Sequence, residues 1–311
     1  MALILLIPAA FVLTLAAVYG KVFYSPHPKQ NDLAHSLRAI QRSRHAPRIQ
    51  EALRELEAAP YERVYIRSRD GLRLTARYFH TADGAPLAIQ VHGYRSHVLR
   101  DFSGDCIPCQ KRGFNVLLIE QRAHGESEGH CISFGIREKY DVIDWANYAA
   151  ERFPGVKILL SGLSMGAATV LLAAAEEELP ENVRGVSFDC GYSSVKAILC
   201  DQIRQMGLPV KPAYFLTRLS ARLFGGFDPD EGDVLAAAKN CRVPALFIHG
   251  EADTFVPWAM SKTLYEACPT AWDFISVPGA THGLAYMEDT ARCARALADF
   301  AAFILQEETH S

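Results

Sequence analysis

One serine lies between two glycines directly after an apolar run. Residues 159–168 read LLSGLSMGAA, and GLSMG within them matches the pattern G-x-S-x-G. The run before it is typical of a buried strand, and AATVLLAAAEEEL after it is rich in good helix formers. At an abrupt strand-to-helix turn, glycines let the backbone pass close to its neighbours while a strained serine projects outward. The sequence therefore predicts Ser164 as a nucleophile near the positive end of a helix dipole.

A serine hydroxyl becomes a good nucleophile only when a base takes its proton. HGEADTFVP places Asp253 just beyond one apolar run, and SVPGATHG places His282 just beyond the last one. The order Ser, Asp, His along the chain is the order that accompanies this motif. We therefore predict His282 as the base and Asp253 as the carboxylate that orients it. Glu251 and Asp189 are alternatives for the acid, and His249 is expected to be a packed strand-end residue.

Attack on a carbonyl also places negative charge on the substrate oxygen, which two backbone N–H groups usually stabilise. The amide of Met165, directly after the nucleophile, is the first candidate. The second is expected in the loop after AIQVHGYRSH, where His92-Gly93 lets the backbone approach. We predict Tyr94 for this amide, with Gly93 and Arg95 as alternatives.

The elements that must hold these residues alternate between strand and helix patterns. RVYIRS and LRLTARYF, separated by a turn at Asp70-Gly71, predict a hairpin. Further apolar runs follow with helical stretches between them: PLAIQVHG, NVLLIE, VKILLSG, RGVSFDC, VPALFIHG and WDFISVPG. Because these runs are continuous, both faces of each strand are expected to be buried. The predicted fold class is α/β, with a doubly wound, mostly parallel sheet.

A long segment separates RGVSFDC from VPALFIHG, at about fifty residues where two to six are usual. We predict that residues 193–239 form a helical cap inserted between strands 6 and 7. Its aromatic and methionine side chains either line a substrate pocket or pack the cap onto the core. The whole catalytic domain is expected to span residues 61–307, after a helical adaptor at residues 21–60.

The N-terminus reads ALILLIPAAFVLTLAAVYG at residues 2–20 and carries no charged side chain. As a helix this stretch would span roughly 28 Å, close to the thickness of a bilayer core. We predict residues 1–20 as an uncleaved transmembrane anchor, with a cleaved signal peptide as the alternative. Because Lys21, Lys29 and Arg38 follow the run and no basic residue precedes it, the catalytic domain is expected to face the cytoplasm.

Composition excludes some classes of function. The formal net charge of −3 over 311 residues gives no electrostatic signature of nucleic-acid binding, and the arginines within residues 38–54 are interpreted as a solvated helix face. The eight cysteines, including Cys106 and Cys109 of one CxxC, predict free thiols rather than a disulfide framework or a metal site. No metal-binding motif or phosphate-binding glycine loop competes with the serine motif, and no cofactor is expected.

With these motifs in place, the chain resembles the α/β-hydrolase superfamily, and within it the lidded branch of serine-aminopeptidase-like and monoglyceride-lipase-like proteins. The resemblance covers roughly residues 61–307 and rests on VHGYRSH, EQRAHGESEG, GLSMG, HGEADTFVP and THG. The second motif looks like the D-x-R-G-H-G-x-S turn of that family, with Glu120 for Asp and Ala123 for Gly. We interpret the loop near His124 and Ser127 as structural rather than catalytic.

These residues predict a serine hydrolase that works by acyl transfer through an acyl-enzyme. Esters are favoured because an alcohol leaving group demands less of the general acid, and the resemblance implies carboxylesterase or lipase activity on apolar or aromatic acyl groups. Peptidase or thioesterase activity is the alternative, whereas a non-catalytic binding module would be expected to have a broken triad. The expected partners are a small acyl ester and, through the N-terminal helix, a membrane, but no nucleic acid.

Overall fold

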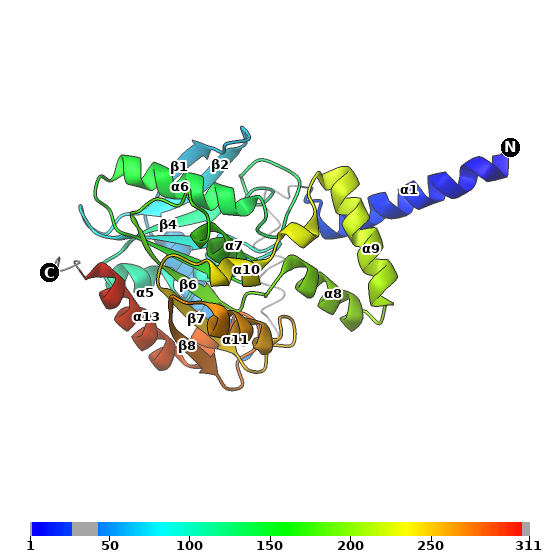
Figure 1. The fold of residues 1–311 in the computed structure, drawn as a ribbon. Coiled ribbons are helices and arrows are strands. Elements are labelled where there is room, and N and C mark those ends of the chain that lie inside the picture. The colour runs from blue at the N-terminus through cyan, green and yellow to red at the C-terminus, as the bar shows by residue number, and fades with distance from the viewer. Residues whose placement is uncertain (1, 27–42, 307–311) are drawn as a thin grey trace.

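A computed structural model describes residues 2–26 and 43–306. At its centre is an eight-stranded sheet with the strand order β1-β2-β4-β3-β5-β6-β7-β8 (Figure 1). The strands are β1 (Glu62–Arg67), β2 (Arg73–Phe79), β3 (Leu87–Val91), β4 (Asn115–Glu120), β5 (Ile158–Leu163), β6 (Val183–Asp189), β7 (Ala245–Gly250) and β8 (Ala271–Val277).

The pairing of the strands confirms the predicted fold class. β1 and β2 form an antiparallel hairpin, and β2 pairs antiparallel with β4. All pairs from β4 across to β8 are parallel. Parallel strands bring their carboxyl ends to one edge of the sheet, so the loops after β3, β5, β7 and β8 meet there. This is where the sequence places its candidate residues.

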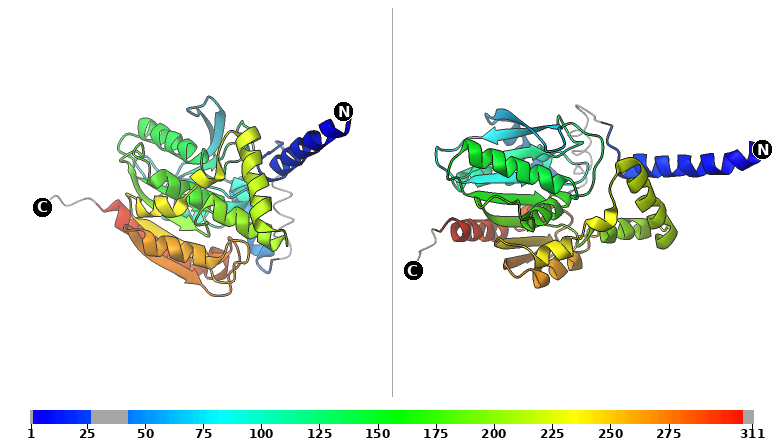
Figure 2. Two further views of the ribbon diagram at one scale, coloured as in Figure 1. Left: turned by 45° about the vertical axis from the view of Figure 1, so that its right-hand side comes forward. Right: turned by 45° about the horizontal axis from the view of Figure 1, so that its top comes forward.

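Helices cover both faces of the sheet (Figures 1 and 2). One face packs against α6 (Glu138–Arg152), α7 (Met165–Ala174), α10 (Val234–Lys239) and α11 (Trp258–Ala267). The other lies under α3 (Ala46–Ala58), α4 (Val98–Phe102), α5 (Cys106–Lys111), α12 (Ala285–Glu288) and α13 (Thr290–Leu305). Neighbouring strand residues alternate between the two cores: Leu160 lies in the first and Leu159 in the second. Both faces are therefore buried, as the apolar runs predict.

The segment between β6 and β7 is helical. It contains α8 (Val195–Gln205), α9 (Val210–Ser220), two short helices, η1 (Ala221–Gly225) and η2 (Pro229–Glu231), and α10. Ser194 caps α8, because its hydroxyl accepts a hydrogen bond from the Ala197 amide. α8 and α9 extend away from the sheet towards α1 (Ala2–Val22), whereas α10 packs on α7 (Figure 1). A cap function for residues 193–239 stays a prediction.

The N-terminal anchor requires a correction. In the two described ranges, 2–26 and 43–306, no helix combines the length and the hydropathy that crossing a bilayer demands. The prediction of a transmembrane anchor at residues 1–20 is therefore wrong, and so are the membrane partner and the membrane-anchored, cytoplasm-facing localisation that depend on it.

The C-terminal end of α1 is instead part of the folded body. It packs against α9 and η1, and Leu15 is only 1% exposed. The Tyr19 ring lies 5.7 Å from that of Phe224, and Phe23 is fully buried between Phe134 and Phe227. Leu15 and Tyr19 of the predicted anchor thus bury protein surface, whereas Phe11, Val12 and Leu13 nearer the N-terminus are 45–70% exposed.

The predicted adaptor is only partly described, since its residues 27–42, with Lys29 and Arg38, lie outside the described ranges. Its remainder includes α3, whose Leu53 and Leu56 are buried in the second core against the sheet. The helical pattern IQEALRELEAA accordingly belongs to an element of the fold rather than to a spacer. The domain boundary at residue 61 stays a prediction.

Candidate active site

Ser164 occupies the single residue between β5 and α7. Its backbone has φ 57° and ψ −115°, a strained conformation for a residue with a side chain that costs about 1–3 kcal/mol. The flanking glycines make the turn possible: a Cβ on Gly166 would collide with the carbonyl of Val91, and one on Gly162 with the carbonyl of Gly166. The close approach of α7 to β3 and β5 thus explains why both positions lack side chains.

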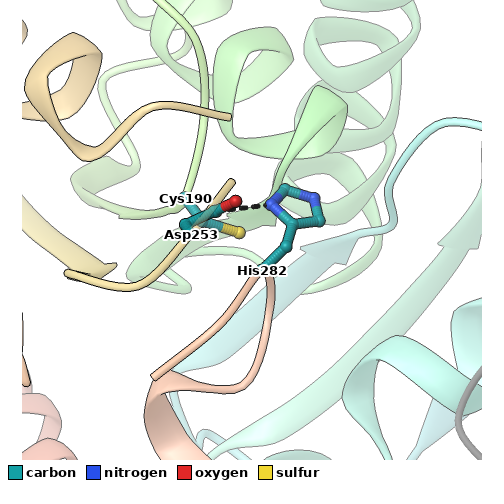
Figure 3. A group of neighbouring side chains, drawn as sticks. All are labelled: Cys190, Asp253 and His282. Atoms are coloured by element: carbon teal, nitrogen blue, oxygen red, sulfur yellow. Dashed lines mark hydrogen bonds and ion pairs between the residues drawn. The ribbon is translucent and has the colours of Figure 1, made fainter. Parts of the chain in front are cut away.

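The structure brings Ser164, His282 and Asp253 together. His282 Nε2 lies 2.9 Å from Ser164 Oγ, and His282 Nδ1 lies 2.7 Å from Asp253 Oδ2. Because a carboxylate only accepts hydrogen bonds, the ring proton is on Nδ1 and Nε2 accepts from the serine hydroxyl. Figure 3 shows the ring of His282 turned towards Asp253. This arrangement allows His282 to withdraw a proton from Ser164.

Asp253 is held in its ionised form. Its side chain is fully buried, and Oδ1 accepts hydrogen bonds from the amides of Phe255 (2.8 Å) and Val256 (2.9 Å). Burial alone would raise the pKa of Asp253, but hydrogen bonds from His249 and His282 outweigh it and keep this pKa well below its usual range. A permanently charged carboxylate therefore fixes the tautomer of His282.

His249 also contacts Asp253, and the sequence pattern did not identify this contact. This fully buried ring donates from Nε2 to Asp253 Oδ2 at 3.0 Å, the same oxygen that His282 uses. Its Nδ1 lies 2.6 Å from Ser261 Oγ. The expectation of a packed strand-end histidine describes its burial but not its contact with the acid. The available sequence signal was that His249 lies near the end of the strand that precedes Asp253, four residues before it.

Neither of the two alternative acids contacts His282. Glu251 points to the exposed surface, where Oε1 accepts a hydrogen bond of 2.7 Å from Ser276 Oγ. Asp189 is a neighbour of the nucleophile, since the Ser164 amide donates to its backbone carbonyl at 2.8 Å. Its carboxylate, however, has no hydrogen bond to His282 among the described residues. Asp253 is thus the one of the three carboxylates that contacts His282.

The backbone near Ser164 offers two unengaged amides. In the described part of the chain, the N–H groups of Met165 and Tyr94 have no hydrogen-bond acceptor. The amides of the two alternatives are engaged: Gly93 donates to Asp101 Oδ2 at 2.8 Å, and Arg95 donates to His124 Nε2 at 3.0 Å. This leaves Met165 and Tyr94 as the pair that is available to an oxyanion.

Buried polar groups shape the loop that carries Tyr94. His92 accepts from the Gln121 amide through Nε2 (3.1 Å) and donates through Nδ1 to the carbonyl of Gly93 (2.8 Å). Burial lowers the pKa of His92 to about 3, so the ring stays neutral. On the outer side, the Tyr94 hydroxyl donates to the carbonyl of Val22 at 2.7 Å. The end of α1 therefore contacts the loop beside the nucleophile.

The side chains of the turn EQRAHGESEG make hydrogen bonds that hold the fold together. The guanidinium of Arg122 binds the buried carboxylate of Asp141, with both contacts at 2.6 Å. Ser127 Oγ donates to the carbonyl of Glu120 at 2.6 Å. This turn contacts the loop beside Ser164 through His124 Nε2, which accepts from the Arg95 amide, and through Gln121, which donates to His92. These contacts agree with the structural interpretation of the segment.

Cys190 completes the immediate surroundings of the acid and base (Figure 3). Among the described residues, Cys190, Asp253 and His282 form the one group whose possible metal-ligand atoms lie within 4.8 Å of one another. A metal would need the thiolate and would displace the proton between Asp253 and His282. Burial raises the pKa of the Cys190 thiol well above its usual value, which opposes the thiolate. The group therefore fits an acid–base relay better than a metal site.

A cavity of about 1200 Å³ opens beside Ser164 and His282. Leu163, Ile248 and Leu297 contribute apolar walls. No residue of the segment 193–239, all of which is described, lines it, so the aromatic residues of that segment are not part of this cavity.

The predicted adaptor contributes one wall of this cavity. Arg44 and His45 both line it, and both contact Glu288 of α12, with His45 Nε2 2.9 Å from Glu288 Oε2. Sequence reasoning interpreted Arg44 as part of a solvated helix face. No local pattern indicates this pairing, because the partners are more than 240 positions apart.

Comparisons of sequence agree with the fold. Residues 92–236 match the family model described as alpha/beta hydrolase fold. The uncharacterized protein YqkD of Bacillus subtilis is 30% identical over 156 residues, which is 50% of this chain and 51% of YqkD. The uncharacterized protein YfhR of Salmonella typhi is 25% identical over 72% of this chain and 75% of its own length. The chain thus spans about half of the first relative and three quarters of the second.

Solved structures share the architecture. The Pyrococcus furiosus esterase Pf2001 superposes with a TM-score of 0.63 at 20% identity, over 80% of this chain and 94% of the esterase. Est1E from Butyrivibrio proteoclasticus, solved with ferulic acid bound, superposes with a TM-score of 0.61 at 20% identity, over 78% of this chain and all of Est1E. At this identity the similarity is one of fold.

Proposed function

The chain belongs to the α/β-hydrolase superfamily, and on that basis we propose that it cleaves carboxylic esters with Ser164 as the nucleophile. The observation that carries the proposal is the hydrogen-bonded series from Ser164 Oγ through His282 to Asp253, at 2.9 Å and 2.7 Å. The esterases among the structural neighbours support the class of reaction.

The first half of the reaction forms an acyl-enzyme. Ser164 Oγ attacks the ester carbonyl carbon while its proton moves to His282 Nε2. The carbonyl oxygen becomes negative and accepts hydrogen bonds from the amides of Met165 and Tyr94. When the tetrahedral intermediate collapses, the bond to the alcohol oxygen breaks and His282 returns the proton to that oxygen. The alcohol leaves, and the acyl group remains on Ser164.

The second half regenerates the serine. A water molecule gives one proton to His282 Nε2 and attacks the acyl carbon, and collapse of this second intermediate returns the proton to Ser164 Oγ. The carboxylic acid leaves. Throughout, Asp253 stays ionised and stabilises the imidazolium of His282, with His249 holding the same carboxylate oxygen. These steps require only residues of this chain and water.

We further propose that residues 61–307 form the hydrolase domain, against which α3 packs as an additional helix, and that residues 193–239 act as its cap. In support, α8 and α9 project from the body, and α1 packs against α9 there (Figures 1 and 2). Met206, Phe215 and Phe224 within this segment are more than 40% exposed. Exposed apolar side chains of this kind suit a surface that meets an apolar substrate as it approaches.

Paired chromogenic substrates test the proposal. On the purified protein, 4-nitrophenyl esters should be hydrolysed with a far higher kcat/KM than aminoacyl 4-nitroanilides, and Ser164→Ala should lose this activity. A strong preference for the anilides would replace the esterase by a peptidase, and a preference for matched thioesters would replace it by a thioesterase. A wild-type protein that turns over none of these substrates and does not react with a fluorophosphonate would favour a non-catalytic binding module.

A further inference from the structure

Polar side chains that the proposed reaction does not use line one side of the cavity. Ser161 on β5 and Ser187 on β6 are directly paired across the two strands, and Asp189 follows two residues after Ser187 on the same face. This face is the one that lies under α13. Together, Ser161, Ser187 and Asp189 form a polar strip that leads to the end of β6, beside the nucleophile.

The strip has few protein partners: a hydrogen bond from the Cys190 thiol to the carboxylate of Asp189 is the one side-chain hydrogen bond that we find for it among the described residues. Asp189 Oδ1 is inaccessible to solvent and has no hydrogen bond to any described residue. The hydroxyls of Ser161 and Ser187 also have no hydrogen-bond partner in the described ranges, although both residues are less than 10% exposed. Buried polar groups are normally paired, because leaving one unpaired costs free energy. Oδ1 itself is enclosed, but Asp189 is only partly buried and the two hydroxyls are not among the enclosed unpaired atoms, so a hydrogen-bonding group in the cavity can reach the strip.

The strip lies close to the reacting atoms. The Ser164 amide donates to the backbone carbonyl of Asp189. Asp189 therefore lies directly beside the nucleophile, on the neighbouring strand. The lining around the strip is apolar: Leu163 and Ile248 are the partners of Asp189 on the neighbouring strands β5 and β7, and Leu297 lies on α13, which covers this face. A plain alkyl chain would match this apolar lining but would leave the strip unpaired. A chain that carries a hydroxyl or amino group would match both the lining and the strip.

We propose that Asp189, with Ser187 and Ser161, is a specificity site for a hydrogen-bond donor on the substrate, and that the preferred ester carries a hydroxyl or amino group on the half that enters this cavity. This inference rests on the proposed esterase function and defines its substrate class. Burial raises the pKa of Asp189 to about 7, so near neutral pH the group accepts from a hydroxyl in either form and attracts an ammonium when ionised.

The test compares esters that differ only at the chain end. Three matched ends are used: methyl, hydroxymethyl and aminomethyl. These ends are placed on chains of roughly two to six carbons. The chain must reach from the ester at Ser164 to the strip on the neighbouring strand, and neighbouring strands lie about 4.8 Å apart. One series carries the end on the acyl half with a constant 4-nitrophenyl leaving group, and the other carries it on the alcohol half of an acetate ester. The measured quantity is the ratio of kcat/KM for the polar end to that for the methyl end.

Asp189→Leu, which is close in shape and cannot accept a hydrogen bond, should lower this ratio by roughly tenfold or more in one series, mainly through KM. Ser187→Ala should lower it less. Asp189→Asn keeps an acceptor oxygen, so it should retain the hydroxymethyl ratio and lose the aminomethyl one above neutral pH. Asp83→Leu, which changes a fully exposed aspartate, is the matched control and should leave both ratios unchanged.

Equal ratios for wild type and Asp189→Leu at every chain length in both series would overturn the specificity site. Hydrolysis of the methyl-ended esters by each variant checks that it is folded. If Asp189→Leu fails this check, Asp189→Asn and Ser187→Ala decide the result.

Binding separates this inference from the proposed function. Calorimetry on Ser164→Ala should show tighter binding of hydroxylated than of plain short carboxylic acids or alcohols, and Asp189→Leu in the same background should remove the difference. A wild type that cleaves no ester but keeps this Asp189-dependent binding would overturn the esterase, whereas an active esterase without the binding difference would overturn the site.

Discussion

In the reaction that we propose, Ser164, His282 and Asp253 act as a unit because each controls a proton of the next. The buried carboxylate holds the proton of His282 on Nδ1, which leaves Nε2 free to accept the serine proton. Hydrogen bonds from the backbone amides of Phe255 and Val256 and from the ring of His249 keep that carboxylate ionised and fixed. In this proposal the reactivity of Ser164 depends on Asp253 and His249, which do not touch the substrate.

Removal of members of this unit should have graded effects. We expect Ser164→Ala and His282→Ala each to lower kcat on a 4-nitrophenyl ester by roughly 10⁶-fold, and Asp253→Asn by roughly 10⁴-fold. Steady-state kinetics on folded variants measures this. Glu251→Gln is the matched control and should be nearly neutral, because Glu251 contacts Ser276 at the surface. A silent Asp253→Asn together with an inactive Glu251→Gln would reverse the assignment of the acid.

Asp189 should give stability a distinct pH dependence. An aspartate in the unfolded chain has a pKa of about 3.9, whereas burial raises the pKa of Asp189 to about 7. Between these values the folded state binds a proton that the unfolded state does not, so Asp189 makes the free energy of unfolding fall as pH rises, and its effect levels off above the folded pKa. Asp189→Asn removes this decrease.

The stability of Asp189→Asn relative to wild type should therefore rise between about pH 4 and pH 7, by at most roughly 4 kcal/mol, and stay constant above. Denaturant titrations of both proteins at several pH values measure it. A difference that does not change with pH would show that the two states bind this proton equally.

At the scale of elements, the site depends on how closely α7 packs against the strands beside it. Glycines at positions 162 and 166 allow the turn between β5 and α7 to approach β3 without side chains between them. The loop after β3 then lies next to the N-terminus of α7, and we expect the amides of Tyr94 and Met165 to reach one substrate oxygen. The turn would thus position both the proposed nucleophile and the proposed oxyanion amides.

Gly166→Ala should strongly destabilise the protein and abolish activity, since its Cβ would collide with the backbone carbonyl of Val91, which has no flexible end to move. Thermal unfolding and ester hydrolysis measure the effect. Gly20→Ala in α1 is the matched control, because a Cβ there meets nothing within 4 Å and alanine favours a helix. Similar melting temperatures for the two variants would show that close packing at Gly166 is unimportant.

Most of this element-level arrangement was predictable from sequence. Continuous apolar runs predict the strands, and the chain order of motifs at their ends predicts that Ser164, Asp253 and His282 meet at one edge. His249 and Asp189 could be noticed as strand-end residues, but which face and which oxygen they contact depends on packing. The contact of Arg44 with Glu288 was beyond prediction, because no local periodicity links α12 to a segment so distant along the chain.

At the scale of the whole molecule, the N-terminal segment and the catalytic edge form one body. Phe23 packs edge-on against Phe134 and Phe227, and residues 20–24 receive hydrogen bonds from Tyr94 and Arg95. Hydropathy alone assigned this segment to a bilayer, because a composition pattern cannot distinguish apolar surface that faces lipid from surface that covers other helices. The loop beside Ser164 is thereby held on its outer side by the N-terminal segment.

Phe23→Ala should destabilise the protein by about 3–5 kcal/mol, because it removes a fully buried ring from the core. Thermal unfolding should show a decrease of several degrees in the melting temperature. Phe11→Ala is the matched control, since Phe11 is 45% exposed and its loss should change little. Equal effects of the two substitutions would mean that the end of α1 does not contribute to the core.

The most direct measurement is the mass of the intact protein after reaction with a fluorophosphonate, followed by mapping of the adduct. We predict one adduct on Ser164 in the wild type, none in Ser164→Ala, and a greatly slowed reaction in His282→Ala while Glu251→Gln reacts normally. An adduct that persists in Ser164→Ala, or a folded wild type that gives none, would contradict the assignment of Ser164 as a nucleophile activated by His282.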